Sequence, residues 1–205
     1  MITVCINCYN DIPTIKRCIQ SVYNQVDRII AVDGKYKDFP GGSWYSTDGT
    51  IEYLCSLDKV ELLFGAGLFE ADKRNIYMDA LNEGDTVLVL DGDEFVAGTI
   101  GKLDKGIDIG LVTFGAPSYR KRLATRFFRY RKGLRHEGIH FILTIGGKWF
   151  NNRRRALSGF KGKKIGNFTI QHLGWKRDKK RKFQKKQYVK SARARESKYK
   201  IASYG

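Results

Sequence analysis

The sequence has no apolar run long enough to cross a lipid bilayer. Its longest uncharged stretch runs from Gly138 to Gly147, whereas a membrane-spanning helix needs about 20 mostly apolar residues. The chain begins with a strand-like pattern and shows no basic leader. These features predict a cytoplasmic protein, and peripheral binding to the inner face of a membrane stays open as an alternative.

Cysteine is scarce, and its distribution predicts neither a metal site nor disulfides. Cys5 and Cys8 have a spacing that zinc sites use, but they lie in the strand-like segment 2–9. Residues three apart on a strand point to opposite faces and cannot share a metal ion. Cys18 and Cys55 are isolated in the sequence. We therefore predict buried, reduced thiols.

Acidic residues are nearly missing from the second half of the chain. Residues 119–205 hold 28 Lys and Arg against 3 Asp and Glu, a net charge of +25, whereas residues 1–118 hold 10 against 18, a net charge of −8. An acidic first half suits a cation site. A basic second half suits contact with polyanions such as nucleic acid, anionic lipid or a phosphate-bearing substrate.

The first half alternates predicted strands and helices. Apolar runs indicate strands, and capping residues followed by apolar residues at helical spacing indicate helices. The predicted strands are 2–9, 27–34, 59–64 and 85–91, and the predicted helices are 10–25, 46–57 and 70–84. This alternation predicts a mostly parallel sheet with helices on both faces.

Carboxylates follow three of these strands. They are Asp11, Asp33, Asp91, Asp93 and Glu94. The carboxyl ends of parallel strands meet at one edge of a sheet, where ligands bind, so these side chains are expected to lie together. Grouped carboxylates repel one another, and the sequence Asp-Gly-Asp at 91–93 suits Mg²⁺ or Mn²⁺ that holds a diphosphate.

The second half is predicted to be rich in antiparallel strands and to end in a basic segment. The predicted strands are 110–119, 122–131, 138–147 and 165–175. Residues 176–200 contain 13 basic and 2 acidic residues, and their apolar stripe consists of Phe183, Tyr188 and Val189. A stripe this thin predicts a mostly solvated helix or a mobile tail.

Five ordered motifs in this chain resemble those of nucleotide-sugar-dependent glycosyltransferases of GT-A fold, in particular the inverting family-2 type. The motifs are INCYND (6–11), IIAVDG (29–34), STDGTIEYL (46–54), ADKRNIYMDAL (71–81) and VLVLDGDEF (87–95). The resemblance continues through RFFRYRKGLRHEGIH (126–140) and IQHLGWKRD (170–178).

The resemblance implies an α/β GT-A fold, Rossmann-like, with a mostly parallel central sheet covered by helices. Residues 1–175 would form a single catalytic domain, in which 1–95 bind the nucleotide sugar and 96–175 form the acceptor half. Residues 176–205 would form a basic C-terminal helix or tail.

The resemblance also implies site residues for the donor nucleotide. Tyr9 and Asn10 would line the nucleotide pocket, although core packing is an equal alternative for Tyr9. Asp33 would contact the base or ribose, and Arg74 would approach the base or the phosphates. Asp91 would support the ribose or the metal shell.

The resemblance implies a metal ion as cofactor, Mn²⁺ or Mg²⁺. Asp93 would ligate the ion that bridges the two phosphates, and Asp91 and His140 would complete its ligands. His172, in the HLG element, is either a further site residue or a structural histidine.

Inverting transfer needs a general base, and Glu137 is the main candidate. Asp93 is the other acidic residue assigned to catalysis, with Asp178 and Glu94 in reserve. The chain departs from its relatives at residues 34–45, an insertion that is either a lid over the donor or a long surface loop. Phe141 stands where relatives often carry a glutamate.

The resemblance implies a nucleotide-sugar donor and an acceptor that is a glycan, lipid or protein. The 13 basic residues of the C-terminal segment, which lacks a large apolar face, predict in addition contact with an anionic surface, either membrane lipid or a charged acceptor. A nucleic-acid-binding protein is the alternative from another class, motivated by the basic half with its interleaved aromatics. The sequence shows no helix-turn-helix, zinc-finger or RNA-recognition signature, so specific nucleic acid is not expected. A nucleotidyltransferase is disfavoured because CYNDIP (8–13) replaces the usual Gly-rich, Lys-containing phosphate loop.

Overall fold

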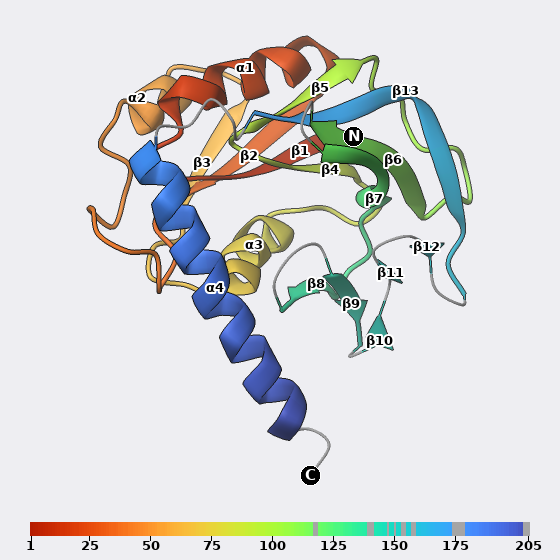
Figure 1. Cartoon of the computed structure of the whole chain (residues 1–205). Coiled ribbons are helices and arrows are strands. Elements are labelled where there is room, and N and C mark those ends of the chain that lie inside the picture. The colour runs from red at the N-terminus through yellow and green to blue at the C-terminus, as the bar shows by residue number, and fades with distance from the viewer. Residues whose placement is uncertain are drawn as a thin grey trace.

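An eight-stranded sheet forms the centre of the structure, a computed structural model, with strand order β3-β2-β1-β4-β7-β6-β13-β5 (Figure 1). The structure describes residues 1–116, 119–138, 142–146, 148–149, 151–152, 155–156, 159–173 and 179–202. Within this part of the chain, no helix is both long and apolar enough to span a membrane.

The first half follows the predicted alternation. Its elements are β1 (Ile2–Cys8), α1 (Ile12–Val22), the 3₁₀ turn η1 (Tyr23–Gln25), β2 (Arg28–Asp33), α2 (Thr50–Cys55), β3 (Val60–Phe64), α3 (Glu70–Asp79), β4 (Thr86–Asp91) and β5 (Glu94–Gly98). Strands β3, β2, β1 and β4 are parallel neighbours. The inner strands β2, β1 and β4 are almost wholly buried because helices cover both of their faces, whereas the edge strand β3 is only partly buried.

Helices α1 and α2 lie on one face of the sheet and α3 lies on the other (Figure 1). Two separate hydrophobic clusters correspond to these two layers. Cys8 belongs to the cluster under α1, and Cys5 belongs to the cluster under α3. The expected opposite orientation of the two thiols is therefore confirmed.

Two expectations for the first half need correction. Cys55 is exposed and not buried, because the short helix α2 buries Thr50 and Leu54 instead. Helix α3 ends at Asp79, about a turn before the predicted end at Gly84. Glu83 and Asp85 there accept hydrogen bonds from backbone N–H groups of Lys132 and Asn82, which stabilises a turn.

The second half extends the sheet and adds two small ones. Its elements are β6 (Ile109–Ala116), β7 (Tyr119–Arg129), β8 (Leu134–Glu137), β9 (Ile142–Ile145), β10 (Lys148–Trp149), β11 (Asn151–Asn152), β12 (Arg155–Ala156), β13 (Gly162–His172) and α4 (Lys179–Ala202). Strand β7 pairs antiparallel with β4 and β6, whereas β13 is parallel to β6 and antiparallel to β5. Four of the seven pairings in the large sheet are parallel, so the predicted mostly parallel α/β class is confirmed.

Strands β5 and β8 were not predicted from the sequence. β5 is made when residues 94–98 turn back and pair with the end of β13, from His172 to Phe168. β8 pairs with β9 in the three-stranded sheet β10-β9-β8. Both strands are only four or five residues long, and their partners are distant in sequence or lie across a loop, so local periodicity does not identify them.

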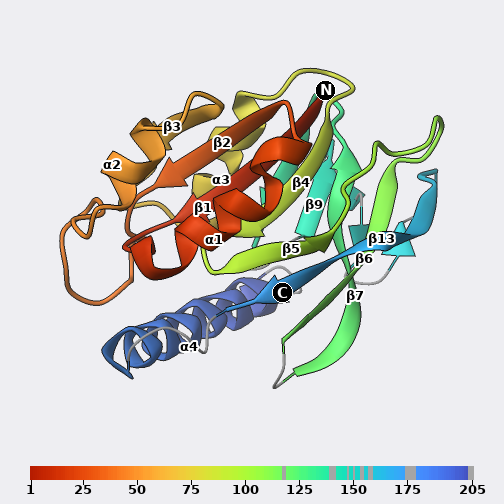
Figure 2. The same ribbon diagram turned by 90° about the horizontal axis from the view of Figure 1, so that it is seen from above.

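Of the two expected forms, a mostly solvated helix or a mobile tail, the structure has the helix, and α4 is docked along one face. Figures 1 and 2 show it crossing the edge of the molecule at which the parallel strands end. Tyr188 and Ala192 are buried in a small cluster with Tyr9 and Phe39, and Val189 packs against this cluster. The opposite face is polar and exposed, and Phe183 is 62% exposed.

We expect Tyr188→Ala to loosen α4. The change removes a buried aromatic ring, and opening of the helix should become at least about tenfold more frequent. The measurement is the rate of trypsin cleavage within α4, which is rich in Lys and Arg. Phe183→Ala removes an exposed ring on the same helix and should leave the rate unchanged. Equal rates for the two variants would contradict the docked position of Tyr188.

Candidate functional site

The candidate site lies where β1 and β4 run side by side. The chain proceeds from β1 outward to β2 and β3 and then returns to place β4 on the other side of β1. Such a reversal of strand order opens a crevice beyond the carboxyl ends of the strands, and ligands bind there in open α/β sheets. Asn7 near the end of β1 is opposite Asp91 at the end of β4.

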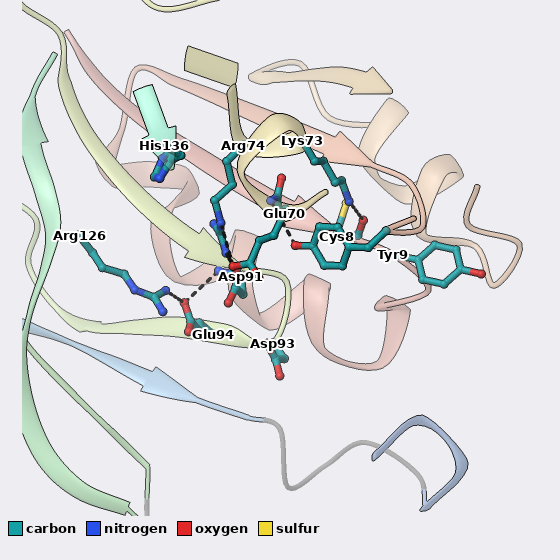
Figure 3. Close-up of polar contacts among 12 residues, drawn as sticks. Cys8, Tyr9, Glu70, Lys73, Arg74, Asp91, Asp93, Glu94, Arg126 and His136 are labelled. Atoms are coloured by element: carbon teal, nitrogen blue, oxygen red, sulfur yellow. Dashed lines mark hydrogen bonds and ion pairs between the residues drawn. The ribbon is translucent and has the colours of Figure 1, made fainter. Parts of the chain in front are cut away.

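Asp91 and Arg74 form an ion pair at this crevice. The Nη2 atom of Arg74 lies 2.8 Å from Oδ1 of Asp91 and 3.1 Å from Oε1 of Glu70, one helical turn earlier on α3 (Figure 3). Burial raises the pKa of Asp91, but the positive charges of Arg74, Arg126 and Lys185 together lower it by more. The net effect is a pKa well below the usual range. Asp91 is therefore a carboxylate at neutral pH.

Glu94 lies beneath Asp91 and is paired with Arg126 of β7 (Figure 3). Its Oε2 atom also accepts a hydrogen bond of 2.9 Å from the backbone N–H of Asp91. Burial is the main cause that raises the pKa of Glu94, and the neighbouring carboxylates add to it, whereas Arg126 acts in the opposite direction. The side chain is 1% exposed, so its role here is to hold the turn after β4.

Asp93 is covered by the C-terminal part of the chain. Its side chain is fully buried, and its Oδ2 atom lies 3.1 Å from Nε2 of His172 and 3.6 Å from Nζ of Lys185. His172 is the last residue of β13, and Lys185 belongs to α4. Two elements distant in sequence therefore cover the second aspartate of the Asp-Gly-Asp motif.

The expected Mn²⁺ or Mg²⁺ does not fit this arrangement. These ions need several oxygen ligands and, for Mg²⁺, bound water as well. Asp91 and Asp93 instead each face a cationic side chain, and Asp93 has no exposed surface. Among the described residues, no group of three or more His, Cys, Asp and Glu side chains could hold a metal ion. His140, the third expected ligand, lies outside the described residues. The metal requirement stays a prediction, and no step below depends on it.

Asp33 is buried by the loop that follows it. Its Oδ2 atom accepts a hydrogen bond of 2.9 Å from the backbone N–H of Ser46, and its Oδ1 atom accepts one from the Ser46 hydroxyl. Burial raises the pKa of Asp33, and the hydrogen bonds from Ser46 and the charge of Lys73 offset this only in part. The structure thus uses Asp33 to close the loop, and contact with a nucleobase stays a prediction.

Tyr9 and Asn10 also contact this loop. The Tyr9 hydroxyl donates a 2.7 Å hydrogen bond to the carbonyl oxygen of Ser43, and its ring packs edge-on against Phe39 at 5.8 Å. The side-chain oxygen of Asn10 accepts a hydrogen bond of 2.8 Å from the backbone N–H of Thr47. Tyr9 is buried by packing, which was the alternative expected for it from the sequence. A nucleotide-binding role for Tyr9 and Asn10 stays a prediction.

Lys73 is a site residue that the sequence analysis missed. Its ammonium is buried and donates hydrogen bonds to the carbonyl oxygens of Cys8 (2.8 Å) and Gly34 (2.7 Å), at the ends of β1 and β2 (Figure 3). Desolvation lowers its pKa to about 8. A signal for it was present, because Lys73 and Arg74 precede the buried Tyr77 and Met78 by one helical turn and so share their face. Arg126 was also missed, and no comparable pattern in the sequence around it indicates its pairing with Glu94.

Glu137, the expected general base, lies on β8 in the three-stranded sheet. Residues of β8 alternate between buried and exposed, so Glu137 faces away from the buried His136. His136 contacts α3 through the Tyr77 hydroxyl at 3.1 Å, whereas Glu137 accepts a hydrogen bond of 2.8 Å from Thr144 of β9. Asp178, a reserve candidate, lies outside the described residues.

Comparisons with known proteins give similarity in structure only. No protein-family model and no curated protein sequence matches this chain. Similar solved structures include S. aureus TarS 1–349 (17% identity, TM-score 0.41) and its complexes with UDP (18%, 0.43) and UDP-GlcNAc (18%, 0.41). Each match covers 58% of this chain and 36–37% of the TarS chain, so this protein spans little more than a third of TarS 1–349.

We expect Asp91→Asn to destabilise the fold. The change leaves the buried Arg74 with Glu70 as its remaining acidic partner, and we expect the free energy of unfolding to fall by about 2 to 3 kcal/mol. Glu61→Gln is the matched control, because it breaks the partly exposed pair with Arg28 and should cost less than about 1 kcal/mol. Urea unfolding measures both values, and equal losses would contradict a buried role for the Asp91 pair.

Proposed function

We propose that this protein is a glycosyltransferase that moves a sugar from a nucleotide diphosphate sugar to an acceptor hydroxyl. The proposal rests mainly on one observation, the position of the ion pair between Asp91 and Arg74 at the crevice between β1 and β4. Fixed charges at that point suit a ligand that carries phosphates. The five sequence motifs that resemble family-2 glycosyltransferases occupy the elements around this crevice.

The reaction breaks the bond between the sugar C1 and the phosphate oxygen and forms a bond between C1 and the acceptor oxygen. The nucleoside diphosphate leaves with the electron pair, and the acceptor proton goes to a general base. Negative charge on the leaving group rises as the bond breaks, so oriented cations lower the barrier. Arg74 is held in one orientation by Asp91 and Glu70 and is suited to this task.

Inversion at C1 and the identity of the base are parts of this proposal. An inverting transfer needs one base on the acceptor side. Asp91 and Glu94 are committed to arginine pairs, whereas Glu137 is exposed on β8. Strand β8 is linked to α3, which carries Arg74, by the hydrogen bonds between Asn75 and His136. Glu137 remains our candidate for the base because it is an exposed carboxylate, although its side chain faces away from that link.

The proposed acceptor is a glycan, lipid or protein, and the exposed side of α4 is proposed to contact an anionic membrane surface. Lys182, Lys186 and Arg193 lie on one helical face and are exposed. The face lacks the apolar area for insertion into lipid, so binding would be electrostatic.

Binding of nucleoside diphosphates tests the proposed function. We expect the protein to bind at least one of UDP, GDP, ADP and CDP in titration calorimetry. UDP and UDP-GlcNAc come first because TarS complexes contain them. Each titration is run with Mn²⁺ and with a chelator, which also tests the predicted cofactor. No binding in either condition would contradict the proposal.

Arg74→Lys should weaken the binding of that nucleotide about tenfold or more, because lysine keeps the charge but loses the planar fork with which arginine side chains bind phosphate groups. Arg28→Lys makes the same change in a surface pair and should leave the affinity unchanged. Circular dichroism of both variants controls for folding. An unchanged affinity in Arg74→Lys would show that the nucleotide binds elsewhere.

Charge reversal on α4 tests the membrane contact. We expect the variant with Lys182, Lys186 and Arg193 each changed to Glu to lose most sedimentation with vesicles that contain phosphatidylserine, since each basic residue contributes about 1 kcal/mol at such a surface. Unchanged sedimentation would contradict the contact. Short DNA duplexes of different sequence test the nucleic-acid alternative, which sequence-dependent affinity would favour.

A further inference from the structure

Helix α4 is anchored to loop 34–45 by specific contacts. The ring of Tyr188 stacks on that of Tyr36, with centroids 5.0 Å apart and an interplanar angle of 15°. One turn earlier, the side-chain N–H of Gln184 donates a 3.0 Å hydrogen bond to the carbonyl oxygen of Pro40. These contacts fix the rotation of the helix as well as its position.

Lys185 projects from the docked side of α4 toward the candidate site. It lies three residues before Tyr188, so the two side chains share one helical face. Its Nζ atom reaches to 3.6 Å from Oδ2 of Asp93. The Lys185 side chain is 40% exposed, whereas Asp93 is fully buried. In this pair only the cation is open to a ligand that enters from solvent.

The side chains around the Asp93 carboxylate are cationic or can become so, unlike the oxygen ligands around a bound divalent metal ion. His172 and Lys185 both reach its Oδ2 atom, and the charge of Lys185 also acts on the carboxylate of Asp91. An aspartate in this position orients the ammonium and offsets its charge while no anion is bound. A diphosphate brings the negative charge that such an ammonium can bind in a charge-assisted hydrogen bond.

We propose that Lys185 binds the diphosphate of the donor and that Asp93, with the contacts between α4 and loop 34–45, positions it there. The inference rests on the proposed function, because it names a further residue of the same donor site. It assigns to the C-terminal helix a part of the positive charge that a divalent metal was expected to supply. Asp93 is then a positioning residue and not a metal ligand.

The test compares Lys185→Gln with wild type for the nucleoside diphosphate that wild type binds, for its nucleoside and for inorganic pyrophosphate. Each titration is made once with a chelator and once with Mn²⁺. We expect Lys185→Gln to bind the nucleoside diphosphate and pyrophosphate at least about tenfold more weakly, as for the loss of one charge-assisted hydrogen bond. Affinity for the nucleoside should not change.

Two further variants separate this role from general effects of charge and folding. Lys190→Gln removes one exposed positive charge from the same helix and should change the affinity less than twofold. Lys185→Arg keeps a cation at the position and should restore most of the affinity. Thermal unfolding checks that α4 and the rest of the fold are intact in each variant.

The possible failures are distinguishable. If wild type binds a nucleoside diphosphate and Lys185→Gln binds it equally well, the role of Lys185 is wrong while the proposed function stands. The same conclusion follows if binding requires Mn²⁺ and is insensitive to Lys185→Gln. If wild type binds no nucleoside diphosphate with or without metal, the proposed function fails and this inference fails with it.

Discussion

Neutralisation of the partly or fully buried carboxylates at the end of β4 and in the turn after it is the interaction on which the other parts of the structure depend. Asp91, Asp93 and Glu94 come from one short turn, and their mutual repulsion in a buried place would be costly without cations. The cations come from elements far apart in the sequence, namely Arg74 of α3, Arg126 of β7 and Lys185 of α4. The turn therefore joins the first half of the chain to the second.

The same principle explains the uneven distribution of charge along the sequence. The acidic half supplies the carboxylates at the strand ends, and the basic half supplies Arg126, His172 and Lys185 around them. Only part of the basic surface is used in this way. One side of α4 packs on loop 34–45, and Lys182, Lys186 and Arg193 on the other side are exposed.

Loop 34–45 connects the end of β2 to the C-terminal helix. At its start, Gly34 adopts φ of 137°, and an added Cβ would lie 2.6 Å from the backbone nitrogen of Ala66. A side chain at this position would clash with the backbone after β3. Only glycine therefore allows the backbone conformation with which the loop starts after Asp33. The Lys73 ammonium donates a hydrogen bond to the carbonyl oxygen of Gly34, and the ring of Tyr36 stacks on that of Tyr188.

The sequence by itself determined the order of strands and helices in the first half, since apolar runs and capping residues report local preferences directly. It also placed Asp91 and Asp93 at the end of β4 and Arg74 on a helix. Tertiary structure alone decided which charges meet. Nothing local in the sequence indicates that Arg126 pairs with Glu94, that Ser46 covers Asp33, or that a docked α4 brings Lys185 to Asp93. Such pairs join residues separated by up to half of the chain, and their partners follow from packing of whole elements and not from periodicity.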